Sequence, residues 1–320
     1  IEADGKLDLS GKEPAFALTT KITALDISPE TQVETDISGD LHIAGTTQDF
    51  EGTFSFGNKG ESWKDLTLKG KVRGDTEVIE LKDLEAKVLG GTISGSAKVS
   101  RETPMRLSAL VTASGLNPAR VRPDLEGNLN IDMKGELLFP EEHPMEGSLT
   151  ASLKKSTFRE KAVSARVDAS FRDEIVKINV LSLKGNGFAA TAAGVVQERL
   201  DYEMRIDDAS KLLPGAAGSL FAKGWARWRE NEPAGILTAQ GKNISYDDAR
   251  LSSLSASAQM PDGYKGDLTI DITGRGLASG IFRANSVSLK VTGTTGDHRI
   301  TLAVAHDRSS LDMRARGEYA

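Results

Sequence analysis

The sequence predicts an all-β fold: an elongated, curved antiparallel sheet of repeats, folded as an open gutter with an apolar concave face and few short helices. Three observations support this prediction. Apolar and polar residues alternate in segment after segment, turn residues interrupt the alternation about every ten to twelve residues, and the pattern repeats along the chain. The composition agrees, because 32 of the 320 residues are Gly, as expected for a chain rich in turns.

Alternation is the feature that assigns the strands. Successive side chains of a strand point to opposite faces, so an apolar residue at every second position gives one apolar and one polar face. The clearest alternating sets are Leu41 and Ile43; Leu129, Ile131 and Met133; Val163, Ala165, Val167 and Ala169; Val176, Ile178 and Val180; Leu268, Ile270 and Ile272; Val287, Leu289 and Val291; and Ile300, Leu302 and Val304.

Helix signals are few, and the best occur at two places. At the first, Asn117 is suited to cap a helix and Pro118 to occupy its first position, which predicts a short helix ending near Arg120. At the second, the segment from Asp208 to Leu213 is stopped by Pro214. Both segments have room for one or two turns.

Internal repetition is visible without gaps. Three glycines are each followed by a large apolar residue two positions later, an aromatic residue eleven positions later and an aliphatic residue five positions after that. The aligned sets are Gly52, Phe54, Trp63 and Leu68; Gly147, Leu149, Phe158 and Val163; and Gly235, Leu237, Tyr246 and Leu251. Upstream, Gly39, Gly127 and Gly218 recur at intervals of 88 and 91 residues. We therefore expect one continuous array over residues 1–320, with a partial repeat at 1–38 and repeats at 39–126, 127–217 and 218–320.

Strands that alternate in this way must place their apolar face against something. A closed outer-membrane barrel requires aromatic girdles, and the 17 aromatic residues are too thinly spread for them. A β-helix has a shorter repeat, of about 20 to 30 residues. An open gutter fits best. The alternative is that the same aliphatic residues form a dry core.

Composition excludes several classes of function. The net charge of −6 leaves no basic surface for nucleic acid, and the absence of Cys removes thiolate metal sites and disulfides. No apolar run approaches the roughly 18 residues of a membrane-spanning helix. The chain opens at Ile1 without a leader, so we interpret it as a piece of a longer protein.

The candidate chemical motifs are weak, and we predict no enzyme, cofactor or metal site. The segment Gly185-Asn186-Gly187 fits a loose dinucleotide fingerprint, but it aligns with glycine pairs of the other repeats and no strong helix follows it. The four histidines, at positions 42, 143, 298 and 306, are scattered along the chain. Only two pairs, His298 with Asp297 and His306 with Asp307, are candidates to come close to each other across neighbouring strands and hold a metal ion. Arg73-Gly74-Asp75 reads as a turn rather than an adhesion motif.

One aromatic cluster is a candidate contact for a partner or a lipid headgroup. Trp225 and Trp228 are interleaved with Arg227 and Arg229, and amphipathic aromatic residues beside Arg are typical of such contacts. Strand alternation alone produces much of the same pattern.

The segment from Asp208 onward resembles the middle repeats of the TamB proteins of the AsmA-like superfamily. The shared features are Leu212-Leu213-Pro214 with Gly218 and Leu220 after it, a strand start at Pro233 to Gly235, and Tyr246 followed by Asp247-Asp248. The segment from Gly293 to His298 and the strand after it continue the likeness, and residues 25–39 and 116–127 match less closely. The resemblance covers the whole chain, through degenerate motifs.

The resemblance implies a β-taco groove in the periplasm of a diderm bacterium, within a protein anchored in the inner membrane. It implies movement of phospholipid between the inner and outer membranes, with the acyl chains as the partner. The alternative it leaves open is a scaffold or chaperone that helps an outer-membrane barrel protein of the TamA/Omp85 type.

The residues expected to line the groove are apolar members of the alternating strands. They are Leu41, Ile43, Phe54, Leu68, Leu129, Ile131, Met133, Leu149, Val163, Val167, Ile178, Val180, Ile206, Leu220, Leu237, Leu268, Ile270, Ile272, Leu289 and Leu302.

Overall fold

The computed structural model describes residues 1–11, 13–26, 35–60, 66–229, 232–263 and 266–317. The chain divides into two compact units. The first consists of Ile1–Arg166 and Ser170–Asp173, and the second of Val167–Ala169 and Glu174–Ala320. The described residues form antiparallel strands and two short 3-10 turns, so the all-β prediction is confirmed.

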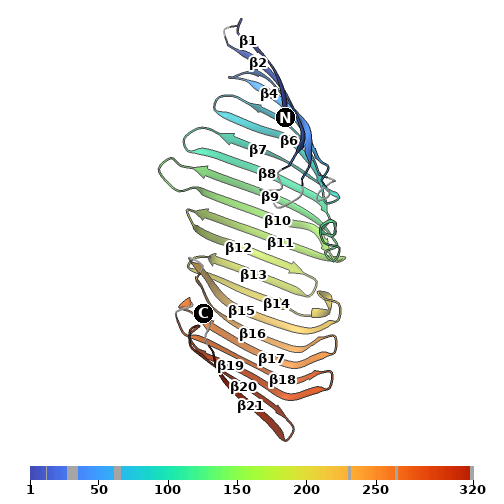
Figure 1. Ribbon diagram of the computed structural model, residues 1–320, viewed down its shortest axis with the longest axis vertical. Coiled ribbons are helices and arrows are strands. Elements are labelled where there is room, and N and C mark those ends of the chain that lie inside the picture. The colour runs from blue at the N-terminus through green and yellow to red at the C-terminus, as the bar shows by residue number, and fades with distance from the viewer. Residues whose placement is uncertain (12, 27–34, 61–65, 230–231, 264–265, 318–320) are drawn as a thin grey trace. The chain divides into compact units, whose positions relative to one another are not determined.

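The first unit is a meander in which each strand pairs with the next in the chain, as Figure 1 shows from β1 downward. Its strands are β1 (Glu2–Asp8), β2 (Ala15–Leu25), β3 (Ile37–Thr46), β4 (Phe50–Asn58), β5 (Thr67–Gly74), β6 (Val78–Val88), β7 (Gly91–Ser100), β8 (Met105–Leu116), β9 (Gly127–Phe139) and β10 (Glu146–Phe158). Strand β11 (Lys161–Arg172) contributes residues to both units.

The second unit is built in the same way, and every strand pairs antiparallel with its neighbour in sequence. Its strands are β12 (Ile175–Gly185), β13 (Phe188–Val195), β14 (Arg199–Ile206), β15 (Ala216–Arg229), β16 (Glu232–Tyr246), β17 (Ala249–Met260), β18 (Leu268–Ser279), β19 (Phe282–Gly293), β20 (His298–His306) and β21 (Ser309–Gly317).

The two predicted helices are single 3-10 turns. In η1 (Pro118–Arg120), the Asn117 side chain accepts a hydrogen bond from the backbone N–H of Ala119, as predicted for a cap. In η2 (Ala209–Lys211), Asp208 accepts from the N–H of Ser210 in the same way. Each turn joins two strands at one edge of the sheet.

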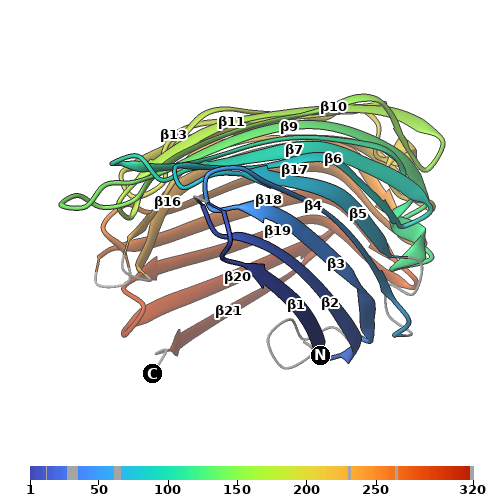
Figure 2. The ribbon, with the colours of Figure 1, turned by 90° about the horizontal axis from the view of Figure 1, so that it is seen from above.

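Inserted residues interrupt the ladder in several strands and bend them. The pairing register shifts at Asp83, Lys155 and Asn243, which adopt left-handed φ values of 50°, 49° and 50°. Such bulges bend a strand and increase its twist, and Figure 2 shows strands β2 to β6 as curved ribbons. A bulge also shifts the alternation by one position, so Leu81 and Leu84 share a face although they are three residues apart.

Neither unit has a second layer. In the part of the chain that the structure describes, the extensive contacts between elements join neighbouring strands, or join η1 to β9 and η2 to β15. The described apolar side chains that are buried are those of Val88, Ala113, Ala222, Ala234, Ala284 and Val291. No large side chain among the described residues is fully buried. The described aliphatic residues therefore do not form a dry core within either unit.

The glycine landmarks that recur in the sequence lie at a regular spacing of strands. Gly39 lies in β3, Gly127 begins β9 and Gly218 lies in β15, so the landmark recurs after six strands. The repeat boundaries themselves stay a prediction. Trp63, the aromatic residue of the first aligned set, lies outside the described residues.

Candidate functional site

The apolar residues of the first unit share one face. Directly opposite residues of an antiparallel pair point to the same side, and the register places Phe54 opposite Leu41 and Gly70, and Ile131 opposite Ala113 and Leu153. The rows of this face, here called the apolar face of the first unit, contain Phe16, Leu18, Leu41, Ile43, Phe54, Phe56, Leu68, Val72, Leu81, Leu84, Ile93, Ala97, Val111, Ala113, Leu129, Ile131, Met133, Leu137, Leu149 and Leu153.

Glycines on this face make room for aromatic rings. A Cβ added to Gly70 would come within 2.7 Å of the Phe54 ring, and one added to Gly147 within 2.4 Å of the Phe171 ring. Phe171 therefore lies on the apolar face of the first unit, and Val163 and Val167 lie on the same side of β11 because they alternate with it.

The second unit has an equivalent apolar face. The register aligns Ile270 with Ala258 and Val291, and Leu289 with Ile272 and Leu302. The rows of this face contain Ile178, Leu181, Leu183, Phe188, Met204, Ile206, Leu220, Ala222, Leu237, Leu254, Leu268, Ile270, Ile272, Val287, Leu289, Val291, Ile300, Leu302 and Val304.

One residue of the expected lining departs from this arrangement. Val180 lies in the register shift between Ile178 and Leu181, and it borders a hollow together with Trp225 and Ile236 of the opposite face. Apart from Val167, which is placed only by its alternation along β11, the other expected lining residues lie on the apolar face of their unit. Their role in holding a lipid stays a prediction.

These faces are apolar and open to solvent. Leu149 keeps 39% of its surface exposed and Leu183 keeps 38%, while most of their neighbours are half-buried by one another. Aliphatic surface left in water costs about 25 cal/mol per Å² relative to burial. A single sheet with such a face is suited to bind flexible apolar molecules, which need no directional contacts.

The opposite face of the first unit is a lattice of ion pairs. Lys69 contacts Glu85 at 2.7 Å and Lys71 contacts Asp83 at 2.8 Å, across β5 and β6. Hydrogen bonding and the charge of Lys71 hold the pKa of the Asp83 carboxyl below its usual value, and the Lys71 pKa is raised in turn. An open hollow of about 910 Å³ lies over these side chains. Its border combines these paired charges with Phe54 and Leu84.

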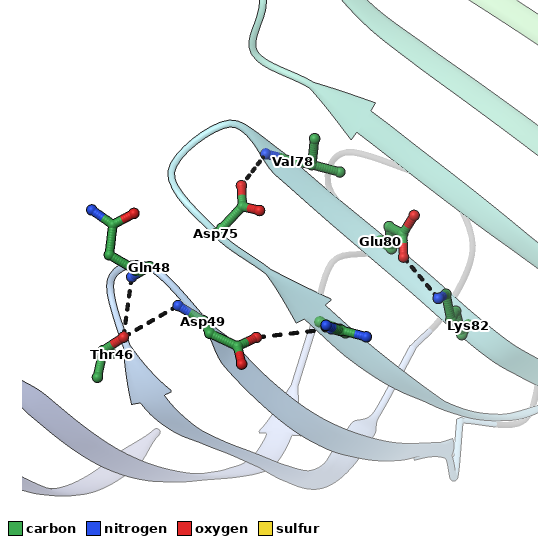
Figure 3. Close-up of polar contacts among 8 residues, drawn as sticks. Thr46, Gln48, Asp49, Asp75, Val78, Glu80 and Lys82 are labelled. Atoms are coloured by element: carbon green, nitrogen blue, oxygen red, sulfur yellow. Dashed lines mark hydrogen bonds and ion pairs between the residues drawn. The ribbon is translucent and has the colours of Figure 1, made fainter.

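Side chains brace the turns at one edge of the first unit, as Figure 3 shows. The Thr46 hydroxyl accepts hydrogen bonds from the N–H groups of Gln48 and Asp49, both at 3.2 Å. The Asp75 carboxylate accepts from the N–H groups of Glu77 and Val78, both at 2.7 Å, and these bonds lower its pKa. Local polar contacts therefore brace this edge, where the Phe16 and Phe50 rings also lie 6.4 Å apart, centre to centre.

The charged face of the second unit contains an apolar hollow that the sequence analysis missed. It measures about 640 Å³ and is bordered by Val180, Ala193, Trp225 and Ile236. The Arg199 guanidinium lies 5.4 Å from the centre of the Trp225 ring. The pairing register between strands brings these residues together. The sequence of each strand taken separately does not give that register.

The predicted Trp cluster is not formed. Trp225 pairs with Ile236 and Trp228 with Pro233, and residues three apart in a regular strand point to opposite faces. Trp225 therefore belongs to the charged face, and Trp228 lies on the other side with 56% of its surface exposed.

The remaining candidate motifs lie in ordinary positions. His298 and His306 lie at opposite ends of β20, and the ring Nε2 of His306 lies 3.7 Å from Asp307. Gly187 forms the β12–β13 turn, and Arg73 and Gly74 end β5. Among the described residues, no group of three or more His, Asp or Glu side chains could hold a metal ion. Over the same residues, no helix has the length and apolar character needed to cross a membrane.

The architecture defines a class: a one-layer antiparallel sheet that presents an uncovered apolar face on one side and charged side chains on the other. A comparison with protein-family models matches the family described as "TamB, N-terminal domain" over residues 1–320. The chain belongs to the TamB family. Comparisons with curated proteins and with solved structures give no match.

Family membership carries general consequences. It indicates a periplasmic, non-enzymatic protein of lipid transport or outer-membrane assembly. Proteins of this family work with lipids and with a partner in the outer membrane.

Proposed function

We propose that the apolar face of each unit holds the acyl chains of phospholipid that moves between the inner and outer membranes across the periplasm. The observation that carries this proposal is the uncovered apolar face, since neither unit has a layer of its own to place against it. The chain acts in this proposal as part of a protein anchored in the inner membrane.

Acyl chains suit such a face for a physical reason. Each CH₂ group removed from water contributes about 0.8 kcal/mol without any directional contact, so a lipid tail can be held at many successive positions of similar free energy. A surface that binds at one fixed position would retain the lipid, whereas equivalent rows of Leu, Ile and Val let it move. No side chain is required to react.

A second function rests on the same one-layer architecture, in which the described strands contact mainly their neighbours along the chain. The backbone of such a sheet can bind an extended strand of another protein by β-augmentation. In this alternative the chain is a scaffold that assists an outer-membrane barrel partner of the TamA/Omp85 type.

Native mass spectrometry of the whole protein after mild extraction separates the two functions. Phospholipid retained by the wild-type protein, and lost when Ile131→Asp and Ile270→Asp are combined, supports the lipid function. A protein that retains its barrel partner but carries no phospholipid contradicts the lipid function and supports the scaffold.

A further inference from the structure

The hairpin between β18 and β19 exposes two apolar side chains at its tip. Ile281 is fully exposed, at 103% of its reference surface, and Phe282 is 49% exposed. Gly280 adopts a φ of +55°, which allows the tight turn. The fold requires glycine at the turn but no apolar residue after it. Ile281 therefore has no role in packing, and its exposed fraction is the highest of the large apolar side chains described.

The neighbouring turns extend this apolar surface along one edge of the second unit. Leu213 is 44% exposed beside η2, and Tyr246 is 52% exposed at the end of β16. The turns are adjacent, because the N–H of Asp247 donates to the carbonyl of Gly215 at 3.2 Å. A Cβ placed on Gly280 would lie 3.7 Å from the Asp248 carboxylate. Leu213, Tyr246, Ile281 and Phe282 are here called the apolar edge.

Basic side chains accompany the apolar edge. Arg250 and Arg283 both lie opposite Ala278, so the two guanidinium groups share a face near the tip. Neither forms an ion pair with another described residue, whereas Lys211 lies 3.7 Å from Asp208. Asp247 and Asp248 add negative charge at the adjacent β16–β17 turn, so the attraction to anions comes from Arg250 on β17 and Arg283 on β19.

A bilayer fits this surface better than a protein does. A specific protein interface buries about 800 Å² on each partner around a packed centre, and the narrow tip of a hairpin does not offer that area. Insertion into the boundary between headgroups and acyl chains needs only a few apolar side chains with Arg beside them. We infer that the β18–β19 hairpin docks on an anionic bilayer surface, with Ile281 and Phe282 in the acyl boundary and Arg250 and Arg283 at lipid phosphates.

This inference goes beyond the proposed lipid function and can fail separately from it. Docking of the hairpin concerns a membrane surface, whereas the proposed function concerns acyl chains on the apolar faces. The opposite edge supplies a matched control: Ile175 is 50% exposed at the start of β12, but it follows Asp173 and Glu174. An anionic surface repels that position.

The absence of Cys from the chain allows a single label at each site. The intact chain carrying Ile281→Cys, labelled with an environment-sensitive nitrobenzoxadiazole dye, is mixed with vesicles of phosphatidylethanolamine and phosphatidylglycerol at 3:1, or of phosphatidylcholine alone. We expect at least a twofold rise in emission, with a blue shift, on the anionic vesicles, and no change for the dye at Ile175→Cys. Equal responses at the two positions, or no response at Ile281→Cys, would overturn the inference.

Vesicle flotation of unlabelled protein gives an independent measurement. The double variant Ile281→Asp and Phe282→Asp should lose at least tenfold in binding to anionic vesicles, while Ile175→Asp binds as the wild type does. Arg250→Ser with Arg283→Ser should weaken binding to the anionic vesicles, and added salt should remove that difference. Because these residues are exposed, all variants should keep the wild-type circular dichroism. Unchanged flotation of the double Asp variant contradicts the docking.

Discussion

The replacement Ile131→Asp places a carboxylate in the middle of the apolar face of the first unit. Ile131 lies opposite Ala113 on β8 and Leu153 on β10, and its own side chain is half-buried. The new carboxylate can therefore reach water from the open side of the sheet. In a closed core the same charge would be buried without a partner, at a cost of several kcal/mol.

The size of the effect follows from this partial exposure. Full burial of an Ile side chain stabilises a fold by about 1.5–3 kcal/mol, so removing a half-buried one should lower the free energy of unfolding by about half as much, roughly 0.8–1.5 kcal/mol. Folded domains have about 5–15 kcal/mol, so the protein should stay folded. A hydrated carboxylate that displaces three or four CH₂ groups of a lipid tail removes roughly 3 kcal/mol of binding, which is about a hundredfold in local occupancy.

The assay combines protein level, circular dichroism and envelope integrity in cells that produce the whole protein. We expect near-normal folding and level for Ile131→Asp, with loss of envelope function. Asp132→Asn is the matched control on the charged face, where Asp132 contacts Lys154 at 2.6 Å and Lys154 is 68% exposed. It should leave both folding and function unchanged. Loss of folded Ile131→Asp protein would refute the open-face reasoning, and full function would show that continuity of the apolar face does not matter.

Three further predictions concern the fold. Ser156→Ala should lower the free energy of unfolding by about 1–3 kcal/mol, measured by urea denaturation. The reason is that Ser156 is only 2% exposed and its hydroxyl accepts a hydrogen bond from the N–H of Asn130 at 2.8 Å. An unchanged denaturation midpoint contradicts this prediction. Lys155→Gly should raise the free energy of unfolding by about 0.5–1 kcal/mol, because Lys155 has a left-handed φ of 49°, which glycine adopts without strain. A loss of stability would show that the backbone at Lys155 is not strained. Asp75→Asn should destabilise the protein at pH 7, and the difference from the wild type should shrink as the pH is lowered below 3.8. The backbone N–H groups of Glu77 and Val78 lower the folded-state pKa of Asp75, so its contribution to stability is complete above the usual value of 3.8 and is lost as the pH falls through the folded value; a difference that does not shrink on acidification contradicts this cause.

The sequence predicts the strands and their two faces because a period of two residues is written directly into the chain. Leu41 with Ile43, and Ile270 with Ile272, need only local alternation to be assigned to one side. The same rule places Trp225 and Trp228 on opposite faces, because they are three residues apart. Their spacing alone was therefore enough to argue against the predicted cluster.

The bulges could not be predicted in this way. Lys155 and Asp83 adopt left-handed backbone conformations without the glycine that usually marks them, and the conformation arises from pairing with neighbouring strands. Val180 leaves its expected face for this reason. The hollow beside Trp225 also depends on register, because it collects residues from five consecutive strands, β12 to β16.

The central claim is that acyl chains occupy the apolar faces, and photocrosslinking in living cells tests it most directly. A photoreactive side chain is placed at Ile131 or Ile270 on the apolar faces, and at Asp132 or Asp271 as neighbours on the charged faces. We predict phospholipid adducts at the two isoleucine positions and none at the two aspartate positions. Equal labelling of both faces, or adducts only with protein at Ile131 and Ile270, would contradict the claim.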